Sequence, residues 1–238
     1  MDKNIRSAQK EVLRVFAKKA KVFALAGGTA LELYYLKHRF SADLDFFSPE
    51  YDLSEINGLI AELAKFSAKK PKLESEFMAG GRARVRFYSL SLKNYPRPLK
   101  IDFVEDVLLD KPRIKIIDGL RIYAVEDIYL HKIFAIAGIE RQEDDIGRQI
   151  TRGRNEARDV FDVYWLSKKI KPLHLFLKNL SPQLQRGMVH WYRSFSRYEL
   201  KTALMDLDIY DKKFDSKALI QHMEREIQQL IKEKVDLE

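Results

Sequence analysis

Two aspartates separated by a single residue, Asp43 and Asp45, are the side chains of this sequence best suited to chemistry. They stand in a run over 39–47 that predicts a strand, in which side chains point alternately to opposite faces. We therefore expect both aspartates on one face, with Leu44 and Phe46 in the core. Paired carboxylates are ligands that hard cations such as Mg²⁺ prefer. The spacing predicts a divalent-cation site on a sheet.

A glycine turn, Gly27-Gly28, lies a short helix upstream of the aspartates. The apolar residues 21–26 before it predict a strand, and residues 29–37 after it predict a helix. Because the free N–H groups at a helix start bind phosphate oxygens, the turn and the aspartates together favour a magnesium–nucleotide site. The simpler interpretation is a strand-to-helix turn in which glycine supplies a positive φ. The two interpretations are compatible.

A third carboxylate, Asp102, interrupts an apolar strand predicted over 99–104. Taken alone, Asp102 fits an exposed position on an edge strand. Beside Asp43 and Asp45 it is better explained as a metal ligand, since two ions about 3.5–4 Å apart can activate an attacking oxygen and stabilise the leaving one. We expect the three aspartates to bind two Mg²⁺ ions, and Asp102 also to help deprotonate an acceptor hydroxyl.

The remaining pattern predicts an α+β protein with two domains. Helices are predicted over 5–19 and 53–66, and strands over 82–92 and in a hairpin over 114–123. From residue 125 onward helical periodicity dominates. The boundaries are therefore placed at 1–124 for a mixed-sheet α/β domain and 125–238 for an all-helical domain.

Apolar stripes in the second half predict which helix faces are buried. Trp191, Phe195 and Tyr198 follow helical spacing, and the arginines between them, Arg193 and Arg197, are expected on the solvent side. Aromatics interleaved with arginines also occur on nucleic-acid surfaces, but core packing is the preferred interpretation. A further stripe on the last helix predicts packing on the body of the protein, through Ile220, Met223, Ile227 and Leu230.

Composition narrows the class of protein. Lys and Arg number 43 against 35 Asp and Glu, which gives a formal net charge of +8. Such a charge favours polyanionic partners, although solubility alone explains it equally well. The absence of cysteine excludes disulfides, zinc–thiolate sites and thiol nucleophiles. No segment predicts a signal peptide or a membrane span, so we expect a cytoplasmic protein without membrane contact.

Four motifs occur in order along the chain: GGTAL at 27–31, HRFSADLDFF at 38–47, KIFAI at 132–136 and RDVFD at 158–162. With them the chain resembles the AbiEii/AbiGii toxin family of nucleotidyltransferases, whose catalytic fold is similar to that of DNA polymerase β. The resemblance implies a nucleotidyltransferase domain fold over 1–124. It also implies nucleotide binding by four residues of the first two motifs, namely Gly27, Gly28, Thr29 and Ser41.

The two later motifs carry the charged residues of the resemblance. It implies that Lys132 neutralises the β- and γ-phosphates of a triphosphate and that Asp159 and Asp162 lie at the rim of the active site. The residues alone leave other interpretations open. Lys132 could be a solvated surface lysine, and Arg158 with Asp162 could form a surface ion pair of small consequence. Asp159 and Asp162 could bind base or ribose, or orient Lys132.

One departure from the family pattern follows the lysine motif. Family members often have an arginine a few residues later, whereas residues 138–141 here read Gly-Ile-Glu-Arg. A polar insertion over 141–154 comes next, in which Arg148, Arg152 and Arg154 would suit phosphate contacts. A solvated loop or helix face is the preferred interpretation of this insertion.

The resulting hypothesis is a Mg²⁺-dependent nucleotidyltransferase that moves a nucleoside monophosphate from a nucleoside triphosphate to an acceptor hydroxyl and releases pyrophosphate. The resemblance implies the toxin of a toxin–antitoxin or phage-defence pair, with RNA, particularly tRNA 3′ ends, as acceptor and a separate antitoxin protein as partner. One alternative is a non-catalytic nucleotide- or RNA-binding module of the same fold. Another is a nucleotidyltransferase that modifies a protein or a small molecule.

Overall fold

The computed structural model describes residues 2–65, 67, 69–79, 82–93, 95–138, 141–143, 149–151 and 153–235. They form two compact units. The first unit comprises Met1–Tyr35 and Phe40–Ile128, and the second comprises Leu36–Arg39 and Tyr129–Glu238. A short segment near the N-terminal end of the sequence therefore belongs to the C-terminal unit.

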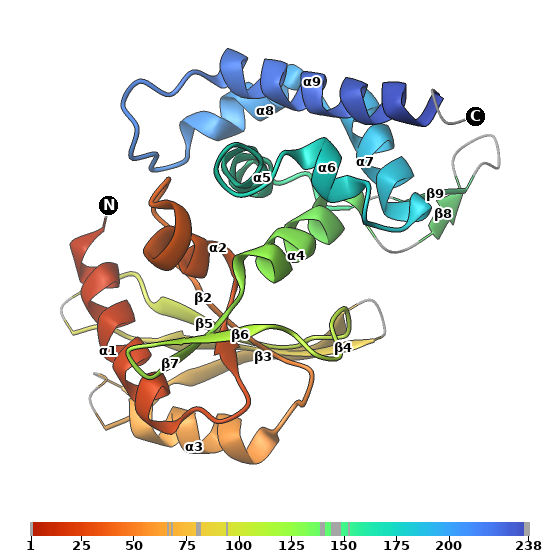
Figure 1. The fold of residues 1–238 in the computed structure, drawn as a ribbon. Coiled ribbons are helices and arrows are strands. Elements are labelled where there is room, and N and C mark those ends of the chain that lie inside the picture. Colours follow the sequence, from red (N-terminus) through yellow and green to blue (C-terminus); the bar gives the residue numbers. More distant parts are fainter. Residues whose placement is uncertain are drawn as a thin grey trace. The chain divides into compact units, whose positions relative to one another are not determined.

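A seven-stranded mixed sheet forms the centre of the first unit, in the order β3-β4-β5-β2-β1-β7-β6 (Figure 1). Its strands are β1 (Ala24–Leu25), β2 (Leu44–Ser48), β3 (Lys72–Ala79), β4 (Ala83–Leu90), β5 (Leu99–Glu105), β6 (Ile114–Ile117) and β7 (Leu120–Tyr123). The pairs β2–β5 and β1–β7 are parallel, and the other neighbouring pairs are antiparallel. The mixed sheet with its helices confirms the α+β class.

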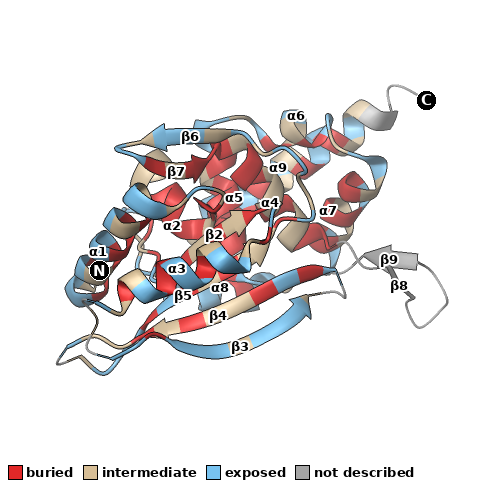
Figure 2. Cartoon of the chain, turned by 90° about the horizontal axis from the view of Figure 1, so that it is seen from below, coloured by how far each residue is buried: buried red, intermediate tan, exposed pale blue. Residues whose placement is uncertain are grey.

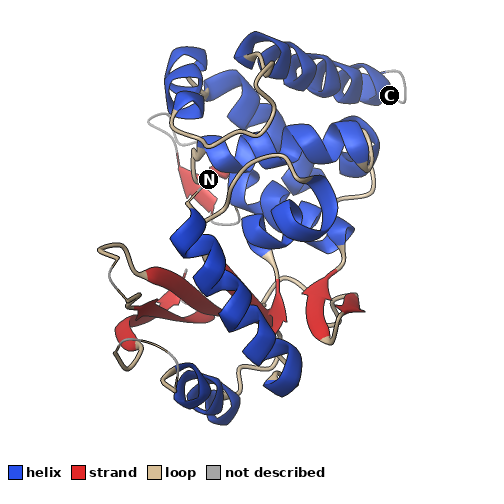
Figure 3. Ribbon diagram, turned by 90° about the vertical axis from the view of Figure 1, so that its left-hand side faces the viewer, coloured by secondary structure: helices blue, strands red, loops and turns tan. Residues whose placement is uncertain are grey.

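Three helical segments accompany this sheet: α1 (Lys3–Lys19), α2 (Gly27–Ala30), which continues as the π-helix η1 (Leu31–Leu36), and α3 (Leu53–Leu63). The helices α1 and α3 begin at aspartate N-caps, because the side chains of Asp2 and Asp52 accept hydrogen bonds from the backbone N–H groups that follow. The α1 helix lies along the sheet (Figure 3).

Aromatic packing shows which face of the sheet is the core. The ring of Phe16 on α1 stacks on Phe46 of β2 at a centroid distance of 3.6 Å and on Phe103 of β5 at 5.9 Å. Leu44 and Phe46 are fully buried, which confirms their predicted place in the core. Since strand side chains alternate, the residues between them on β2 and β5 point to the opposite face.

The structure differs from the sequence-based expectation in three places within this unit. The strand around the aspartates begins only at Leu44, so Asp43 lies in the loop that precedes it. The helix predicted over 29–37 is a short α-helix followed by a π-helix. A strand that the sequence did not predict, β3, forms one edge of the sheet and is largely exposed (Figure 2).

The second unit is mainly helical: α4 (Val125–Ala137), α5 (Ala157–Lys169), α6 (Leu173–Leu177), α7 (Pro182–Ser194), α8 (Arg197–Met205) and α9 (Ser216–Val235). A strand pair, β8 (Arg141–Glu143) with β9 (Gln149–Thr151), interrupts the helices, so the prediction of an all-helical C-terminal half is confirmed only in part. The apolar stripe of α9 is buried as predicted. In the part of the chain that the structure describes, no helix combines the length and the apolar character needed to cross a membrane.

Candidate active site

Asp45 and Asp102 occupy the same level of the sheet on adjacent parallel strands. Asp45 of β2 is in register with Asp102 of β5, and the flanking pairs Leu44–Ile101 and Phe46–Phe103 are buried. Neighbouring strands lie about 4.8 Å apart, so two carboxylates in register on one face are neighbours. The sheet therefore places two acidic side chains together on the face opposite Phe16.

Gly27 lies directly against the carboxylate of Asp45. A Cβ atom built on Gly27 would overlap Oδ2 of Asp45 and lie 2.9 Å from its Cγ. Gly27 also has a φ of +64°, a left-handed conformation that disfavours side chains. The backbone N–H of Ala26 donates to the carbonyl oxygen of Asp45 at 2.9 Å. The backbone of the glycine turn thus packs directly against the Asp45 side chain, an approach that only a residue without a Cβ atom permits.

Replacing Gly27 by Ala is expected to destabilise the protein by about 1–2 kcal/mol, because alanine in the left-handed region is strained. It should also lower activity by about 10²-fold, since the new methyl group must displace the Asp45 carboxylate and a shift of about 1 Å at a reacting centre costs that much. Thermal unfolding and nucleotide-transfer rates measure the two effects.

Gly58→Ala is the matched control, because a Cβ at Gly58 in the middle of α3 meets nothing within 4 Å. This variant should keep full activity and gain about 0.5–1 kcal/mol, as alanine is the better helix former. Equal activity in the Gly27→Ala and Gly58→Ala variants would contradict the close contact with Asp45.

The loop that carries Asp43 is held by buried side chains from two helices. The Gln9 amide on α1 donates to the carbonyl oxygens of Ser41 at 2.8 Å and Ala42 at 2.9 Å. The Thr29 hydroxyl donates to the carbonyl oxygens of Asp43 and of Ser41, the latter at 3.3 Å. Because this loop has no strand partner, these side chains satisfy the carbonyl groups that a ladder would otherwise pair.

An acidic side chain completes this support. The backbone N–H of Ser41 donates to Oε2 of Glu32 on η1 at 2.9 Å, and Arg6 on α1 pairs with the other oxygen of Glu32. Arg6, Gln9 and Glu32 are all buried. None of these three residues belongs to the predicted site, although a glutamine and two charges on buried helix faces are a signal that the sequence carries.

The predicted nucleotide-binding residues of the first unit take different positions. The first N–H groups of α2, from Gly27, Gly28 and Thr29, have no intrahelical acceptor, as at any helix start, and Ala26 at the N-cap gives them no side-chain capping bond. The Thr29 side chain is fully buried and turned toward the loop. Ser41 is buried, and its backbone is fixed at both its N–H and its carbonyl group.

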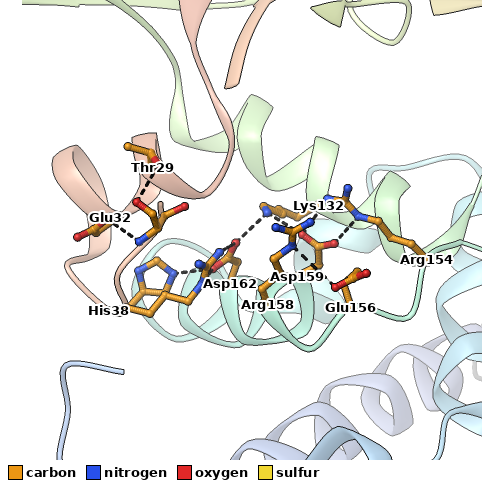
Figure 4. Close-up of polar contacts among 11 residues, drawn as sticks. Thr29, Glu32, His38, Lys132, Arg154, Glu156, Arg158, Asp159 and Asp162 are labelled. Atoms are coloured by element: carbon orange, nitrogen blue, oxygen red, sulfur yellow. Dashed lines mark hydrogen bonds and ion pairs between the residues drawn. The ribbon is translucent and has the colours of Figure 1, made fainter. Parts of the chain in front are cut away.

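Lys132 and two aspartates form a buried ion cluster inside the second unit (Figure 4). The Nζ atom of Lys132 on α4 lies 2.6 Å from Oδ1 of Asp159 and 2.8 Å from Oδ2 of Asp162, both on α5. Asp159 and Asp162 are fully buried and Lys132 is almost so. The structure therefore shows the two aspartates contacting Lys132, and it excludes the solvated-surface interpretation of all three residues.

The segment Leu36–Arg39 supplies further partners to this cluster. Arg39 donates two hydrogen bonds to Asp162, from Nε to Oδ1 at 2.7 Å and from Nη2 to Oδ2 at 2.8 Å. His38 Nε2 lies 2.7 Å from Oδ1 of Asp162, and its ring stacks on Phe161 at 5.6 Å. The ion cluster on α4 and α5 thus fixes His38 and Arg39, which lie a few residues before Asp43 in the sequence.

Arg154 brings a second cation into contact with Asp159. Its Nε lies 2.5 Å from Oδ2 and its Nη2 3.1 Å from Oδ1 of Asp159. The backbone N–H of Arg154 donates to the carbonyl oxygen of Ala135 near the end of α4 at 2.9 Å. Arg154, the last residue of the insertion, therefore contacts the helix of the lysine motif, while Arg148 and Arg152 lie outside the described residues.

Burial and charge act in opposite directions on this cluster. Burial disfavours the ionised form of Asp162, but Lys132 and Arg39 outweigh it and hold the pKa of Asp162 well below its usual range. Burial likewise opposes ionised Asp159, whose pKa Lys132 and Arg154 nevertheless lower. Lys132 keeps a raised pKa because the two aspartates outweigh its burial. All three groups are therefore charged at neutral pH.

The stability of the protein should fall in two steps as pH decreases. Burial lowers the pKa of His38 even though Asp162 opposes that change. A group with a lowered folded pKa contributes stability that is present above its unfolded pKa and lost as pH falls. The first loss is expected below about pH 6.5 from His38, and a steeper one below about pH 4 from Asp159 and Asp162. Denaturant unfolding between pH 8 and 3 measures both steps.

The His38→Gln variant separates the two steps, because it removes the ring that titrates near neutrality and leaves the aspartates in place. This variant should lose the part of the first step that His38 contributes, leaving the part from His222, whose pKa burial also lowers, and keep the second step. If its profile between pH 7 and 5 matched that of the unchanged protein, His38 would not be the source of the first step.

No three His, Cys, Asp or Glu side chains within the described ranges are grouped as a metal site. The acidic pair Asp45–Asp102 is nevertheless consistent with Mg²⁺, which is usually bound by one or two carboxylates together with substrate phosphates and water. A preformed cage of three protein ligands is not required for such a cation.

The chain is similar to one family of proteins in sequence and to two solved structures in fold. A family model described as nucleotidyl transferase AbiEii toxin, Type IV TA system, matches residues 12–236. A crystal structure described as an inferred nucleotidyltransferase from H. pylori is similar with a TM-score of 0.61 and 18% identity, over 99% of this chain and 96% of that one. No curated protein matches the chain.

A second crystal structure, of JHP933 from Helicobacter pylori, has a TM-score of 0.58 and 20% identity, over 98% of this chain and 95% of the other. At these identities the two solved structures support the fold alone. The match to the family model covers nearly the whole chain and includes all four motifs.

Proposed function

The chain belongs to the nucleotidyl transferase AbiEii toxin family, and we propose that it transfers a nucleoside monophosphate from a nucleoside triphosphate to an acceptor hydroxyl. The observation that carries this proposal is the in-register pair Asp45–Asp102 beside the glycine turn at Gly27. Carboxylates next to free helix N–H groups suit a cation-bound triphosphate.

In this reaction the acceptor oxygen attacks the α-phosphorus of the triphosphate. The bond from the α-phosphorus to the oxygen that bridges it to the β-phosphorus breaks, and pyrophosphate leaves with that electron pair. Asp102 accepts the proton of the acceptor hydroxyl. Most of the rate would come from positioning and from stabilisation of the charge that develops on the phosphate oxygens.

Asp43, Asp45 and Asp102 are proposed to hold Mg²⁺. When bound, the ion would neutralise phosphate charge and lower the pKa of the attacking hydroxyl. The role of the chain is to fix the carboxylates beforehand. Asp45 and Asp102 are fixed by the strand register, and Asp43 by the hydrogen bonds to the backbone of its loop.

The triphosphate is proposed to lie against the start of α2, where the backbone of Gly27, Gly28 and Thr29 offers N–H groups, next to Ser41. Lys132, Asp159 and Asp162 are proposed to complete nucleotide binding. Lys132 is the cation that neutralises the β- and γ-phosphates, and the aspartates hold its ammonium group in one place.

The acceptor is proposed to be RNA, with tRNA 3′ ends as the first candidate, and a cognate antitoxin protein is proposed to restrain the enzyme. The net charge of +8 supports a polyanionic partner. The Type IV toxin–antitoxin description of the family supports the antitoxin partner and a role in a toxin–antitoxin system, and a role in phage defence is proposed beside it.

The test is incubation with each labelled nucleoside triphosphate, Mg²⁺ and total cellular RNA, beside the Asp43→Ala, Asp45→Ala double variant. Label on an RNA band that requires the aspartates is the expected result. Label on a protein or a small molecule would replace the proposed acceptor. Nucleotide binding that is independent of Mg²⁺, with no label anywhere, would identify a non-catalytic binding module.

A further inference from the structure

The helical unit carries a cation-lined groove along α7, with α9 as its other wall. Arg186, His190 and Arg193 supply the cationic side, and the apolar side includes Leu230 and Ile231. The groove has a volume of about 260 Å³. The two helices pack against each other within the same unit (Figure 1).

Helical geometry places the three basic residues on one face. Their spacing of four and then three residues repeats the turn of a helix, and the rise of 1.5 Å per residue separates Arg186 from Arg193 by about 10 Å. The opposite face of α7 is anchored in the core through Met188 and Trp191. The cations are therefore presented on a helix that is fixed by its own packing.

Some cations of this unit are held in ion pairs. Lys178 pairs with Glu233, and Arg154 pairs with Asp159. Arg186 and Arg193 are exposed, and neither forms an ion pair with any residue in the described part of the chain. Two guanidinium groups without carboxylate partners, about 10 Å apart on one helix face, form a site for an anion with repeated charges.

We propose that this groove binds the phosphodiester backbone of the RNA acceptor. The proposal rests on the proposed function, because it assigns a surface to the acceptor named there. With about 10 Å between them, the two guanidinium groups can contact different phosphates of one strand. Guanidinium groups match phosphate geometry with two parallel hydrogen bonds.

The size of the groove favours a backbone over other ligands. Pockets that enclose a small molecule measure about 300–1,000 Å³, so a groove below that range suits one edge of a longer chain. Leu230 and Ile231 offer aliphatic contact to ribose. A protein partner would need an interface of roughly 800 Å² on each side, whereas the groove is small and has Arg186, His190 and Arg193 along one side.

The experiment measures binding of fluorescein-labelled bulk tRNA to the full chain by fluorescence anisotropy at several salt concentrations. The Arg186→Gln, Arg193→Gln variant should bind about tenfold more weakly, with each exposed contact contributing a few-fold. The slope of log affinity against log salt should fall by about 1.4, because two phosphate contacts are lost. The Arg186→Lys, Arg193→Lys variant should keep most of the salt slope.

Lys212→Gln, Lys213→Gln is the matched control. Both lysines are exposed in the same unit outside the groove, and their replacement removes the same charge. It should bind tRNA nearly as the unchanged protein does. Equal losses in the two double variants, or no loss in the groove variant, would overturn the proposal.

Transfer assays distinguish this proposal from the proposed function. If the unchanged chain labels RNA and the groove variant labels it with the same KM, the groove proposal fails and the function stands. If the unchanged chain neither binds nor labels tRNA but transfers nucleotide to a protein, the RNA acceptor and the groove proposal fail together. The expected result is a raised KM for RNA with unchanged nucleotide affinity.

Discussion

Replacing Asp45 by Asn is expected to lower the rate of nucleotide transfer by about 10³-fold or more while leaving the protein folded. The loss of one ligand charge at a metal–phosphate centre removes several kcal/mol of transition-state stabilisation, and each 1.4 kcal/mol is a factor of about ten. Asn keeps the shape of the side chain against Gly27, so the close contact with the glycine turn is preserved.

The effect on stability should have the opposite sign. Asp45 and Asp102 are in register on neighbouring strands, and like charges placed directly opposite each other destabilise a sheet by a fraction of a kcal/mol. Removing one charge is therefore expected to leave the unfolding temperature unchanged or slightly higher. A residue whose replacement abolishes activity without loss of stability is held in place for function.

Asp110→Asn is the matched control, because Asp110 is exposed in the loop after β5 and the substitution is chemically the same. Single-turnover transfer rates and thermal unfolding of both variants provide the measurement. Asp102→Asn should behave like Asp45→Asn. Transfer by Asp45→Asn at the rate of Asp110→Asn would show that the in-register pair does not bind the reacting phosphate.

The side of the sheet on which Asp45 lies was predictable because it depends on a local rule. Alternation along a strand places Leu44 and Phe46 in the core, and an aspartate between them must face the other side. The prediction was less accurate for Asp43, because strand alternation carries no information about where a strand begins. Asp43 lies in a loop whose position depends on Gln9, Thr29 and Glu32 instead.

Long-range partners account for most of what the sequence did not predict. Asp162 contacts His38 and Arg39, which lie 124 and 123 residues away along the chain, and no periodicity connects such positions. The same limit applies to residues 36–39 as a whole, which pack with the C-terminal unit. The motifs identified Lys132, but its burial between two aspartates depends on the packing of α4 against α5, which the motifs do not predict.

Helix boundaries explain the remaining errors. Trp191 and Phe195 are buried as their spacing predicted, but Tyr198 is 80% exposed. The reason is that α7 ends at Ser194 and Ser196 caps a new helix, so the periodic stripe is interrupted. The edge strand β3 was missed because three of its eight residues, Lys72, Glu74 and Glu76, are charged, as suits an exposed edge.

Replacing Asp162 by Asn is expected to destabilise the helical unit by about 3–5 kcal/mol, the usual cost of leaving buried charges without their partner. Both oxygens of Asp162 accept two hydrogen bonds from donors: Oδ1 from His38 and Arg39, and Oδ2 from Arg39 and Lys132. In either orientation an Asn side chain turns its NH₂ group toward two of these donors, and the negative charge that holds the cations is lost.

Glu156→Gln is the control for this substitution, because Glu156 is exposed at the start of α5 and loses the same charge. Its unfolding free energy should change by less than about 0.5 kcal/mol. A double-mutant cycle with Lys132→Met separates charge pairing from packing. The double variant should be more stable than the sum of the single losses predicts, because removing Lys132 relieves one of the cations that Asp162→Asn leaves buried. Strict additivity of the two losses would mean that Asp162 gains no stability from Lys132 and contributes through His38 and Arg39 instead.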